Sequence, residues 1–363
     1  MADHPKVLFL VHALGGGGAE RVTVNLANYL ASSGWSAYLL PLQTGGHSYP
    51  IDPQVEVDEG APQGGNRYVR GLRKLTYVGR AIRRFRPDVV VSLGAGFGYL
   101  TSPTLRVPFH LVTQIATDPT YLMAQGLLTR VTYARAFARS DRIVFQTQGA
   151  LDYYDEEVQR KGVIISNPLR DGLVHNPTPF ETREKEVVAF GRLIPQKRPD
   201  VLVDAFALFH EQNPEYRLAL FGEGPLAGAV RTQIETLGLS DSVTLSPFRD
   251  DIHNRVRNAA MYILSSDVEG LPNSMLEAMT LGIPSVCTDC APGGARETIE
   301  QFSSGVLVPA GDPAALADAM TQLAKNPERA NALIAAGAPL GELLSGERIY
   351  KEWADVISGV TAR

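Results

Sequence analysis

Two glutamates and two cations are the side chains in this sequence whose types and spacing could do chemistry together. Glu269 and Glu277 stand eight positions apart in SSDVEGLPNSMLEAM, and Arg192 and Lys197 stand five apart in FGRLIPQKRPD. An Arg fork beside a Lys suits a diphosphate, and a carboxylate accepts hydrogen bonds from vicinal hydroxyls. Two carboxylates could instead form an acid–base or metal-binding pair, and all four groups could be solvated surface charges.

A run of four glycines, Gly15 to Gly18 in ALGGGGAERV, follows the first expected strand and opens an expected helix. Backbone N–H groups can approach an anion closely in such a turn, and the helix dipole favours negative charge there. The dinucleotide pattern is not met because position 20 is Glu20, and no Walker Gly-Lys-Ser/Thr follows. The alternative is a flexible strand-to-helix turn.

Two later glycine pairs also follow expected strands. Gly222 and Gly224 in FGEGP would leave room for a flat ring, such as a nucleotide base, against the backbone. Gly293 and Gly294 in CTDCAPGGARE precede an expected helix and form a second turn suited to phosphate.

Other site chemistries have weaker support. Cys287 and Cys290 form a C-x-x-C unit, but no second Cys/His pair stands at zinc spacing. Cys287 ends an apolar strand pattern, where Cys acts as a small hydrophobe. The histidines, including His253 on an expected helix, form no catalytic cluster and are interpreted as structural. Asp250 and Asp251 are adjacent rather than spaced as D-x-D, so this signature of a metal-bound diphosphate is missing. We expect no metal and no other cofactor.

These candidates stand in a chain of alternating expected strands and helices. Continuous apolar runs such as KVLFLVHAL and PDVVVSLGA indicate strands buried on both faces, and ERVTVNLANYLASSG has helical spacing. Later strands are expected at EVVAFGRL, YRLALFGEG, SVTLSPF, AAMYILSS and IPSVCTD. Two such runs predict two doubly wound, Rossmann-like α/β domains, with ligands at the carboxyl ends of the strands in the cleft between the domains.

The domain boundaries are expected at polar, aperiodic segments. We predict a first domain at residues 1–167, a linker at 168–186 and a second domain at 187–345. A C-terminal helix at 346–363, with apolar Ile349, Trp353 and Ile357 at helical spacing, is expected to cross back to the first domain.

Composition narrows the class of protein. The 363 residues are 44% apolar and 20% charged, and no apolar run approaches the roughly 20 residues that span a bilayer. A cytoplasmic protein is expected. Charge is uneven, at +4 over residues 1–167 and −9 over residues 168–363, which indicates that the first domain faces an anionic partner.

Residues 67–87, RYVRGLRKLTYVGRAIRRFRP, contain eight cations and no acid. Leu72, Leu75, Ile82 and Phe85 could form an apolar stripe along a helix. A basic amphipathic helix is typical of an anionic membrane surface, and the alternative is a core-packing helix with a solvated basic face. Nucleic-acid binding is disfavoured, because few aromatics are interleaved and the net charge is −5.

Taken in order, GGGGAERV, FGRLIPQKRPD, LFGEGP, VEGLPNSMLEAM, GIPSVCTD and VPAGDPAALADAM resemble the retaining glycosyltransferases of family 4, which have the GT-B fold. The resemblance covers nearly the whole chain. It implies an enzyme that moves a sugar from a nucleotide diphosphate sugar, expected to be UDP-linked, to a lipid-linked or polysaccharide acceptor. An N-acetylhexosamine is a candidate sugar. A synthase or phosphorylase on the same fold, or a non-catalytic sugar-binding protein, is the alternative.

The resemblance also implies roles for individual residues. Arg192 and Lys197 would hold the donor diphosphate, Glu277 the ribose hydroxyls, and Glu269 would lie near the donor sugar at the reacting centre. The implied nucleotide-sugar contacts also include Gly16, Gly17, Gly222, Gly224, Leu271, Asn273, Gly293 and Gly294.

One position departs from the family pattern. Many members carry a His after the fourth strand, where TQIATDPTY here has Ala116. Asp118 and Glu20 are the remaining candidates for contacts to the donor sugar or the acceptor.

Overall fold

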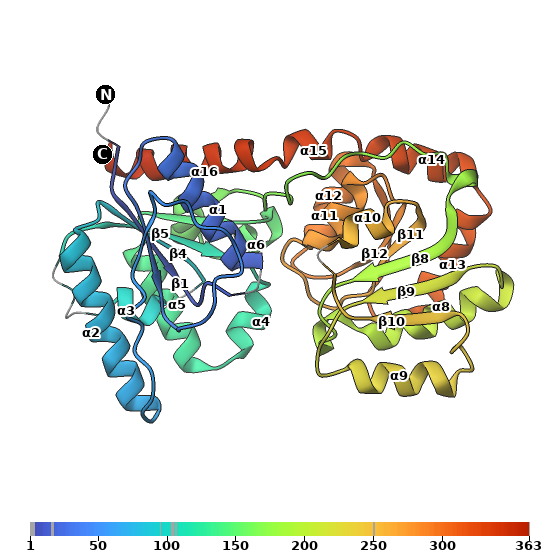
Figure 1. Ribbon diagram of the computed structural model, residues 1–363, viewed down its shortest axis with the longest axis horizontal. Coiled ribbons are helices and arrows are strands. Elements are labelled where there is room, and N and C mark those ends of the chain that lie inside the picture. The colour runs from blue at the N-terminus through green and yellow to red at the C-terminus, as the bar shows by residue number, and fades with distance from the viewer. Residues whose placement is uncertain are drawn as a thin grey trace. The chain divides into compact units, whose positions relative to one another are not determined.

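The structure is a computed structural model that describes residues 4–15, 18–94, 96–102, 105, 107–249 and 251–362, apart from the side chain of residue 67. It divides into two compact units. The first comprises Met1–Pro168 with Glu347–Arg363, and the second comprises Leu169–Gly346 (Figure 1). Each unit is an α/β structure built on one parallel sheet.

The first unit contains a seven-stranded parallel sheet in the order β3-β2-β1-β4-β5-β6-β7. Its strands are β1 (Val7–Val11), β2 (Ala37–Pro41), β3 (Glu56–Val57), β4 (Val89–Leu93), β5 (His110–Ile115), β6 (Arg142–Phe145) and β7 (Gly162–Ile164). The strands β1 and β4 are buried along their whole length, as their continuous apolar sequences predict. The short strand β3 was not predicted, because two residues carry no periodic signal.

Helices connect these strands and cover the sheet. They are α1 (Gly18–Ser32), α2 (Arg67–Phe85), α3 (Phe97–Leu100), α4 (Pro119–Ala124), α5 (Leu127–Arg139), α6 (Gln148–Asp152) and α7 (Glu156–Lys161). Leu8 and Leu10 of β1 belong to one core cluster with Val78 and Ile82 of α2. Alternate residues of a strand point to opposite faces, so α2 covers the Leu8–Leu10 face of this sheet.

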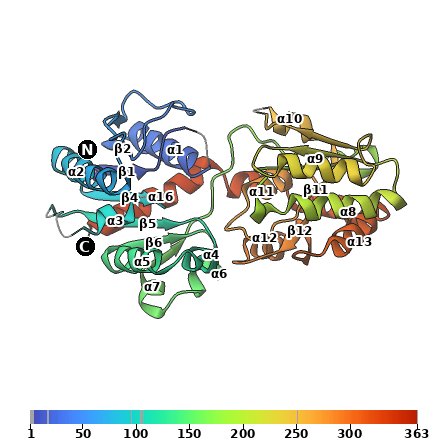
Figure 2. The ribbon, with the colours of Figure 1, turned by 90° about the horizontal axis from the view of Figure 1, so that it is seen from below.

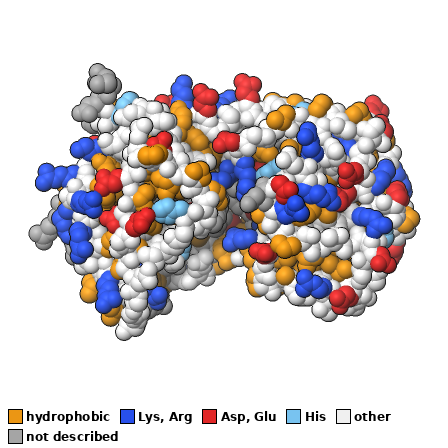
Figure 3. Space-filling view, viewed as in Figure 1, with side chains coloured by type: hydrophobic (Ala, Val, Ile, Leu, Met, Phe, Trp, Pro, Cys, Tyr) orange, Lys and Arg blue, Asp and Glu red, His pale blue; other side chains and the backbone are white. Residues whose placement is uncertain are grey.

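The two halves of the apolar stripe on helix α2 differ in burial. Ile82 and Phe85 are buried in the core, whereas Leu72 is 64% exposed. The helix is therefore a core-packing element in its second half only. Lys and Arg side chains gather on the surface along α2 (Figures 1 and 3).

The C-terminal helix α16 (Gly346–Thr361) lies almost entirely within the stretch that is grouped with the first unit. Trp353 and Ile357 are fully buried, and the ring of Tyr350 lies 5.7 Å from that of Tyr29 in α1. The helical spacing of its apolar residues predicts this buried face.

The second unit contains a six-stranded parallel sheet in the order β10-β9-β8-β11-β12-β13. Its strands are β8 (Glu184–Phe190), β9 (Arg217–Phe221), β10 (Val243–Ser246), β11 (Ala259–Leu264), β12 (Ser285–Asp289) and β13 (Gly305–Pro309). Sequence reasoning missed β13. The apolar run of this edge strand is short, from Val306 to Pro309, and its first three residues are only partly buried.

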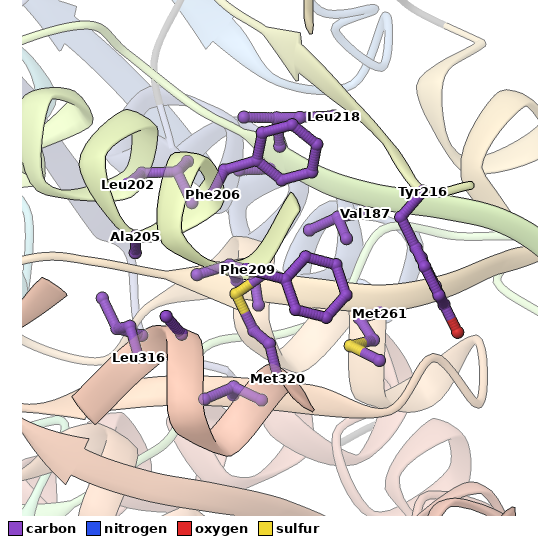
Figure 4. Close-up of a cluster of buried hydrophobic side chains, with 14 of the residues drawn as sticks. Val187, Leu202, Ala205, Phe206, Phe209, Tyr216, Leu218, Met261, Leu316 and Met320 are labelled. Atoms are coloured by element: carbon purple, nitrogen blue, oxygen red, sulfur yellow. The ribbon is translucent and has the colours of Figure 1, made fainter. Parts of the chain in front are cut away.

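Helices cover both faces of this sheet. They are α8 (Pro199–Gln212), α9 (Ala227–Thr236), α10 (Ile252–Val256), α11 (Asn273–Thr280), α12 (Gly294–Phe302), α13 (Pro313–Ala324), α14 (Pro327–Ala336) and α15 (Leu340–Leu343), with 3₁₀ turns η1 (Phe180–Thr182) and η2 (Pro195–Lys197). Seen from below, α8, α9 and α13 lie side by side across one face (Figure 2). In the core beneath them, Phe209 of α8 lies next to Met320 of α13 (Figure 4).

Residues 168–186, expected to be a linker, pack almost entirely within the second unit. Arg183 is 4% exposed, and its guanidinium donates hydrogen bonds to the carbonyls of Asn176, Arg257 and Ala259. Burial lowers the pKa of Arg183 to about 10. The polar residues of this segment, which suggested a solvent-exposed linker, are partly engaged in hydrogen bonds to the folded second unit.

Among the described residues, none of the helices combines the length and the apolar character that crossing a membrane requires.

Replacing Phe209 by Ala should lower the free energy of unfolding of the second unit by about 3–5 kcal/mol, because it opens a cavity in a fully buried cluster. Leu208→Ala is the matched control, since Leu208 is the preceding residue on α8 and is 40% exposed. Urea unfolding followed by circular dichroism measures both variants. Equal losses for the two would contradict the assignment of Phe209 to the core.

Candidate functional site

Three of the four predicted charged groups follow the two strands between which the order of the second sheet reverses. Strands β8 and β11 are adjacent, with Val188 opposite Tyr262. After β8 the chain continues to β9 on one side, and after β11 it continues to β12 on the other. Crevices form at such points beyond the carboxyl ends of the strands. Arg192 and Lys197 follow β8, and Glu269 follows β11.

Lys197 and Glu269 form an ion pair across this reversal. The Lys197 ammonium donates to Oε1 of Glu269, and the Ser266 hydroxyl donates to the same oxygen over 2.6 Å. The two side chains are only 25% and 11% exposed. A pair so shielded from water interacts more strongly than a surface pair. The structure thus brings together two residues that were predicted to share one ligand.

Backbone contacts hold the two loops in this position. The Ser265 hydroxyl donates to the carbonyl oxygens of Lys197 and Arg198, over 2.9 and 3.0 Å. The backbone N–H of Asp267 donates to the Gln196 carbonyl. Arg198, which has a φ of 45°, bridges Asp200 and Asp267. Arg198 is therefore occupied in fastening the loops.

Arg192 lies beside this pair with its side chain exposed. A small cavity in the second unit is lined by Arg192, Lys197, Ser265, Ser266 and Ser274, among others. Within the described part of the chain, the Arg192 guanidinium makes no hydrogen bond and no ion pair. It is a cation available to a ligand at the mouth of the site.

Glu277 lies on α11 and has partners of its own. Its side chain is 10% exposed, with Oε2 3.0 Å from Nε2 of His253 and Oε1 3.6 Å from Nε of Arg170. Arg170 also lies over the Phe248 ring, at 5.6 Å from the centroid. Glu277 is thus held by two groups from separate segments.

Sequence reasoning missed both of these partners. His253 was interpreted as structural, and Arg170 falls in the segment expected to be a linker. Because these contacts join Glu277 to positions distant in the chain, no local pattern indicates them. The one signal in the sequence that could have indicated a partner is His253, because it lies on α10, the helix that follows a strand of the sheet containing the site.

The later glycines are required by close approach of backbone to backbone. A Cβ on Gly222 would lie 1.8 Å from the Gly191 carbonyl oxygen, and one on Gly224 would lie 2.3 Å from that of Leu193. A Cβ on Gly294 would lie 2.0 Å from the Gly270 oxygen. Packing of neighbouring loops accounts for these three glycines, and their contact with a nucleotide stays a prediction.

Two helices begin at the same edge. Helix α11 begins at Asn273, two residues after Leu271, and α12 begins at Gly294 after Gly293 with φ 100°. Neither helix has a side-chain hydrogen bond at its N-cap. Since Gly294 packs on the loop that precedes α11, the positive ends of both helix dipoles lie close to the reversal point.

The candidates in the first unit have separate local environments. Gly16 and Gly17 lie outside the described residues. Glu20 lies in the first turn of α1, where an acid suits the helix dipole. Asp118 is 2% exposed and caps α4, accepting from the backbone N–H and the hydroxyl of Thr120. Capping accounts for this carboxylate without a sugar.

The two cysteines are free and buried. Burial raises the pKa of the Cys287 thiol and raises that of Cys290 to about 12, so both remain protonated near neutral pH. In the described ranges, no three His, Cys, Asp or Glu side chains are grouped in a way that could hold a metal ion.

Comparison with known protein families matches most of the chain. The model described as Glycosyltransferase Family 4 matches residues 16–171, and the model described as Glycosyl transferases group 1 matches residues 173–338. The two matches meet close to the boundary between the two units.

Individual relatives agree with the family match. An uncharacterized glycosyltransferase of Haemophilus influenzae is 22% identical over 97% of this chain and 99% of its own length. The amylovoran biosynthesis glycosyltransferase AmsD of Erwinia amylovora is 25% identical over 80% of this chain and 83% of its own.

Among solved structures, HepE of Anabaena in complex with UDP-glucose has a TM-score of 0.80 and 19% identity, covering 98% of this chain and 100% of that one. This likeness shows a shared fold, which has two Rossmann-like sheets of seven and six strands in the present structure. The chain is a glycosyltransferase enzyme of family 4, with the GT-B fold.

Proposed function

We propose that this enzyme transfers a sugar from a UDP-linked donor to a lipid-linked or polysaccharide acceptor with retention of the anomeric configuration. The observation that carries the proposal is the grouping of Arg192 with the Lys197–Glu269 pair at the reversal of the second sheet. HepE, with the same fold, was solved with UDP-glucose, and AmsD acts in amylovoran biosynthesis. Both support a nucleotide-sugar donor and a polysaccharide product.

Charge supports the assignment of the donor diphosphate. Arg192 offers an exposed planar donor fork, and Lys197 offers a second cation that already holds Glu269. The uncapped N-termini of α11 and α12 add backbone N–H groups and positive dipole ends. The diphosphate would lie among these groups, with Glu269 beside the attached sugar and Glu277 at the ribose hydroxyls.

The two glutamates fit donor binding better than glycosidase chemistry. Glu269 accepts hydrogen bonds from Lys197 and Ser266, and Glu277 lies within 3.0 Å of His253. A general acid must give a proton to the leaving group, and these carboxylates are already engaged as acceptors. A carboxylate already held as an acceptor by a cation or a His fits ligand binding better than proton donation.

The leaving diphosphate itself can serve as the base, a role that the two carboxylates do not fill. Departure of the diphosphate from the anomeric carbon leaves an oxocarbenium-like sugar. Arg192, Lys197 and the oriented N–H groups stabilise the charge that develops on the phosphate oxygen. That oxygen accepts the proton of the attacking hydroxyl, which approaches on the same face and so retains the configuration.

Lys197→Ala should lower kcat by about 10²–10³-fold, because the lysine stabilises charge that grows in the transition state. Lys185→Ala is the matched control, since Lys185 lies over the rings of Phe180 and Tyr216. Release of UDP from a panel of UDP-sugars measures turnover, and thermal unfolding checks that both variants are folded. A folded Lys197→Ala enzyme with unchanged kcat would remove the diphosphate role.

His253→Ala should raise KM for the donor more than it lowers kcat, because His253 positions Glu277 and does not meet the reacting atoms. His253→Gln, which keeps a side-chain donor, should recover much of the loss. His210→Ala is the control, since His210 contacts Ser242 instead.

A 2′-deoxy donor separates ribose binding from general loosening of the site. In the wild type, loss of the 2′-hydroxyl should weaken binding by about tenfold or more, as for a hydrogen bond to a charged group. In His253→Ala the same loss should cost less, because Glu277 is no longer held in place. Equal costs in both proteins would show that His253 does not act through the ribose contact.

Removal of divalent metals by EDTA should leave the initial rate unchanged, since Arg192 and Lys197 meet the charge of the leaving diphosphate. Initial rates before dialysis, after dialysis and after return of Mg²⁺ or Mn²⁺ measure this. A rate that falls on chelation and returns with metal would contradict the metal-independent mechanism.

A further inference from the structure

Ser266 lies in the loop after β11 and contacts the glutamate proposed to lie beside the donor sugar. Its side chain is fully buried, and its hydroxyl donates to Oε1 of Glu269 over 2.6 Å. Among the described residues, this is the one hydrogen bond that the Ser266 hydroxyl makes. A buried hydroxyl with a single partner orients that partner, so Ser266 acts on the carboxylate of Glu269.

The two carboxylate oxygens of Glu269 have different surroundings. Oε1 accepts from both the Lys197 ammonium and the Ser266 hydroxyl. Within the described part of the chain, Oε2 takes part in no hydrogen bond and no ion pair. It is not among the side-chain atoms that are buried without a partner in the described ranges, so it retains contact with solvent. Oε2 is therefore the oxygen that is left to accept from a ligand.

Backbone contacts from the end of β12 fix the loop that carries both residues. The hydroxyl of Thr288, a fully buried residue of β12, donates to the Ser266 carbonyl over 2.6 Å. The backbone N–H of Glu269 donates to the Ala291 carbonyl over 3.1 Å, and Val268 pairs with Ala291 in a parallel β-bridge. The freedom that remains belongs to the Glu269 side chain. Restraining a long side chain before binding lowers the entropic cost of binding.

The two groups that donate to Oε1 would respond differently to a diphosphate. Lys197 is a cation, which a phosphate attracts strongly. Ser266 is neutral and buried, so a phosphate does not draw its hydroxyl away from the carboxylate. The side chain of Glu269 is only 11% exposed, and a carboxylate so shielded is costly to leave without a donor. Ser266 can therefore hold Glu269 in place while Lys197 turns toward the diphosphate.

We propose that Ser266 is a positioning residue, which holds Oε1 of Glu269 so that Oε2 is presented to one hydroxyl of the donor sugar. The inference deepens the proposed function and rests on it, because it takes the donor to be a UDP-linked sugar. Ser266 acts on the sugar through Glu269 alone. One hydroxyl of the sugar should consequently contribute more to binding than the others, and its contribution should depend on Ser266.

Titration calorimetry with the full chain, without an acceptor, measures the Kd of UDP, of the UDP-hexose that binds most tightly, and of its monodeoxy analogues. Ser266→Ala should weaken binding of the UDP-hexose roughly tenfold, the scale of a hydrogen bond to a charged group. UDP lacks the sugar, so its Kd should stay close to that of the wild type. Equal weakening of UDP and UDP-hexose would overturn the proposal, because it would indicate general loosening of the loop.

The monodeoxy analogues test whether Ser266 acts through Glu269. In the wild type, one analogue should bind about tenfold or more weakly than the parent UDP-hexose, because a hydrogen bond to a carboxylate is lost. In Ser266→Ala, removal of the same hydroxyl should cost much less, and the costs at the other positions should be unchanged. Equal costs at every position in both proteins would also overturn the proposal.

Two neighbouring serines provide matched controls. Ser265→Ala removes a hydroxyl that donates to the carbonyls of Lys197 and Arg198, so it should weaken UDP and UDP-hexose alike. Ser285→Ala removes a fully buried hydroxyl at the start of β12, which donates to the Ile283 carbonyl over 2.9 Å. Because Ser285 lies at the other end of this strand from the site, its variant should bind all the ligands as the wild type does.

Thr288→Val keeps the test decisive if Ser266→Ala does not fold, which thermal unfolding shows. This variant removes the donor to the Ser266 carbonyl and should give the same selective loss of UDP-hexose to a smaller extent. Equal loss of UDP and UDP-hexose in Thr288→Val would contradict the role of Ser266.

Failure of this inference can be told from failure of the proposed function. A wild type that bound no UDP-hexose would overturn the proposed function, and the role of Ser266 with it. A wild type that bound UDP-hexose, with unchanged costs in Ser266→Ala, would overturn the role of Ser266 alone.

Discussion

Strands β8 and β11 lie side by side, yet the chain leaves them toward opposite edges of the sheet. Right-handed crossovers then place α8 on one face and α11 on the other, as Figure 1 shows. No helix can cover the gap between the two strand ends. The loops that carry Arg192, Lys197 and Glu269 border the gap between the strand ends. The positions of these charges therefore depend on the reversal of strand order.

The charges at the rim are arranged so that a ligand that binds Lys197 has to replace its partner, Glu269. Lys197 is held by Glu269 in a largely buried pair, while Arg192 extends into solvent. Leaving one member of a buried pair unpaired costs about 3–5 kcal/mol. Under the proposed function, a diphosphate would engage Arg192 freely, but it would gain most from Lys197 when the donor also satisfies Glu269. A hydroxyl-bearing sugar attached to that diphosphate meets this condition.

The sequence was most informative where an element requires one type of residue along its whole length. Buried central strands require unbroken apolar runs, and β1, β4 and β11 could be recognised by them. The strand β3 has only two residues and β13 is partly exposed, so neither requires a long apolar run, and both were missed. The apolar stripe of α2 was visible, but sequence alone could not separate its buried half from its exposed half, because both show the same spacing.

The site itself was predictable only in part. Strand-end position and residue type indicated Arg192, Lys197, Glu269 and Glu277. Their partners depend on contacts between segments distant in the chain, as with Arg170 and His253, and no local pattern records such contacts. Asp118 was ambiguous for another reason, because a carboxylate before a short helix serves equally well as a cap or as a ligand.

The close stacking of loops at the carboxyl edge bears on how variation in this enzyme should be interpreted. At Gly222, Gly224 and Gly294 any side chain would collide with a neighbouring carbonyl group. Selection for folding alone would keep glycine there, even in a descendant that had lost its donor. Invariance at these three positions would therefore record backbone packing, whereas divergence at Arg192, whose side chain makes no hydrogen bond or ion pair within the described fold, would bear on the proposed donor contact.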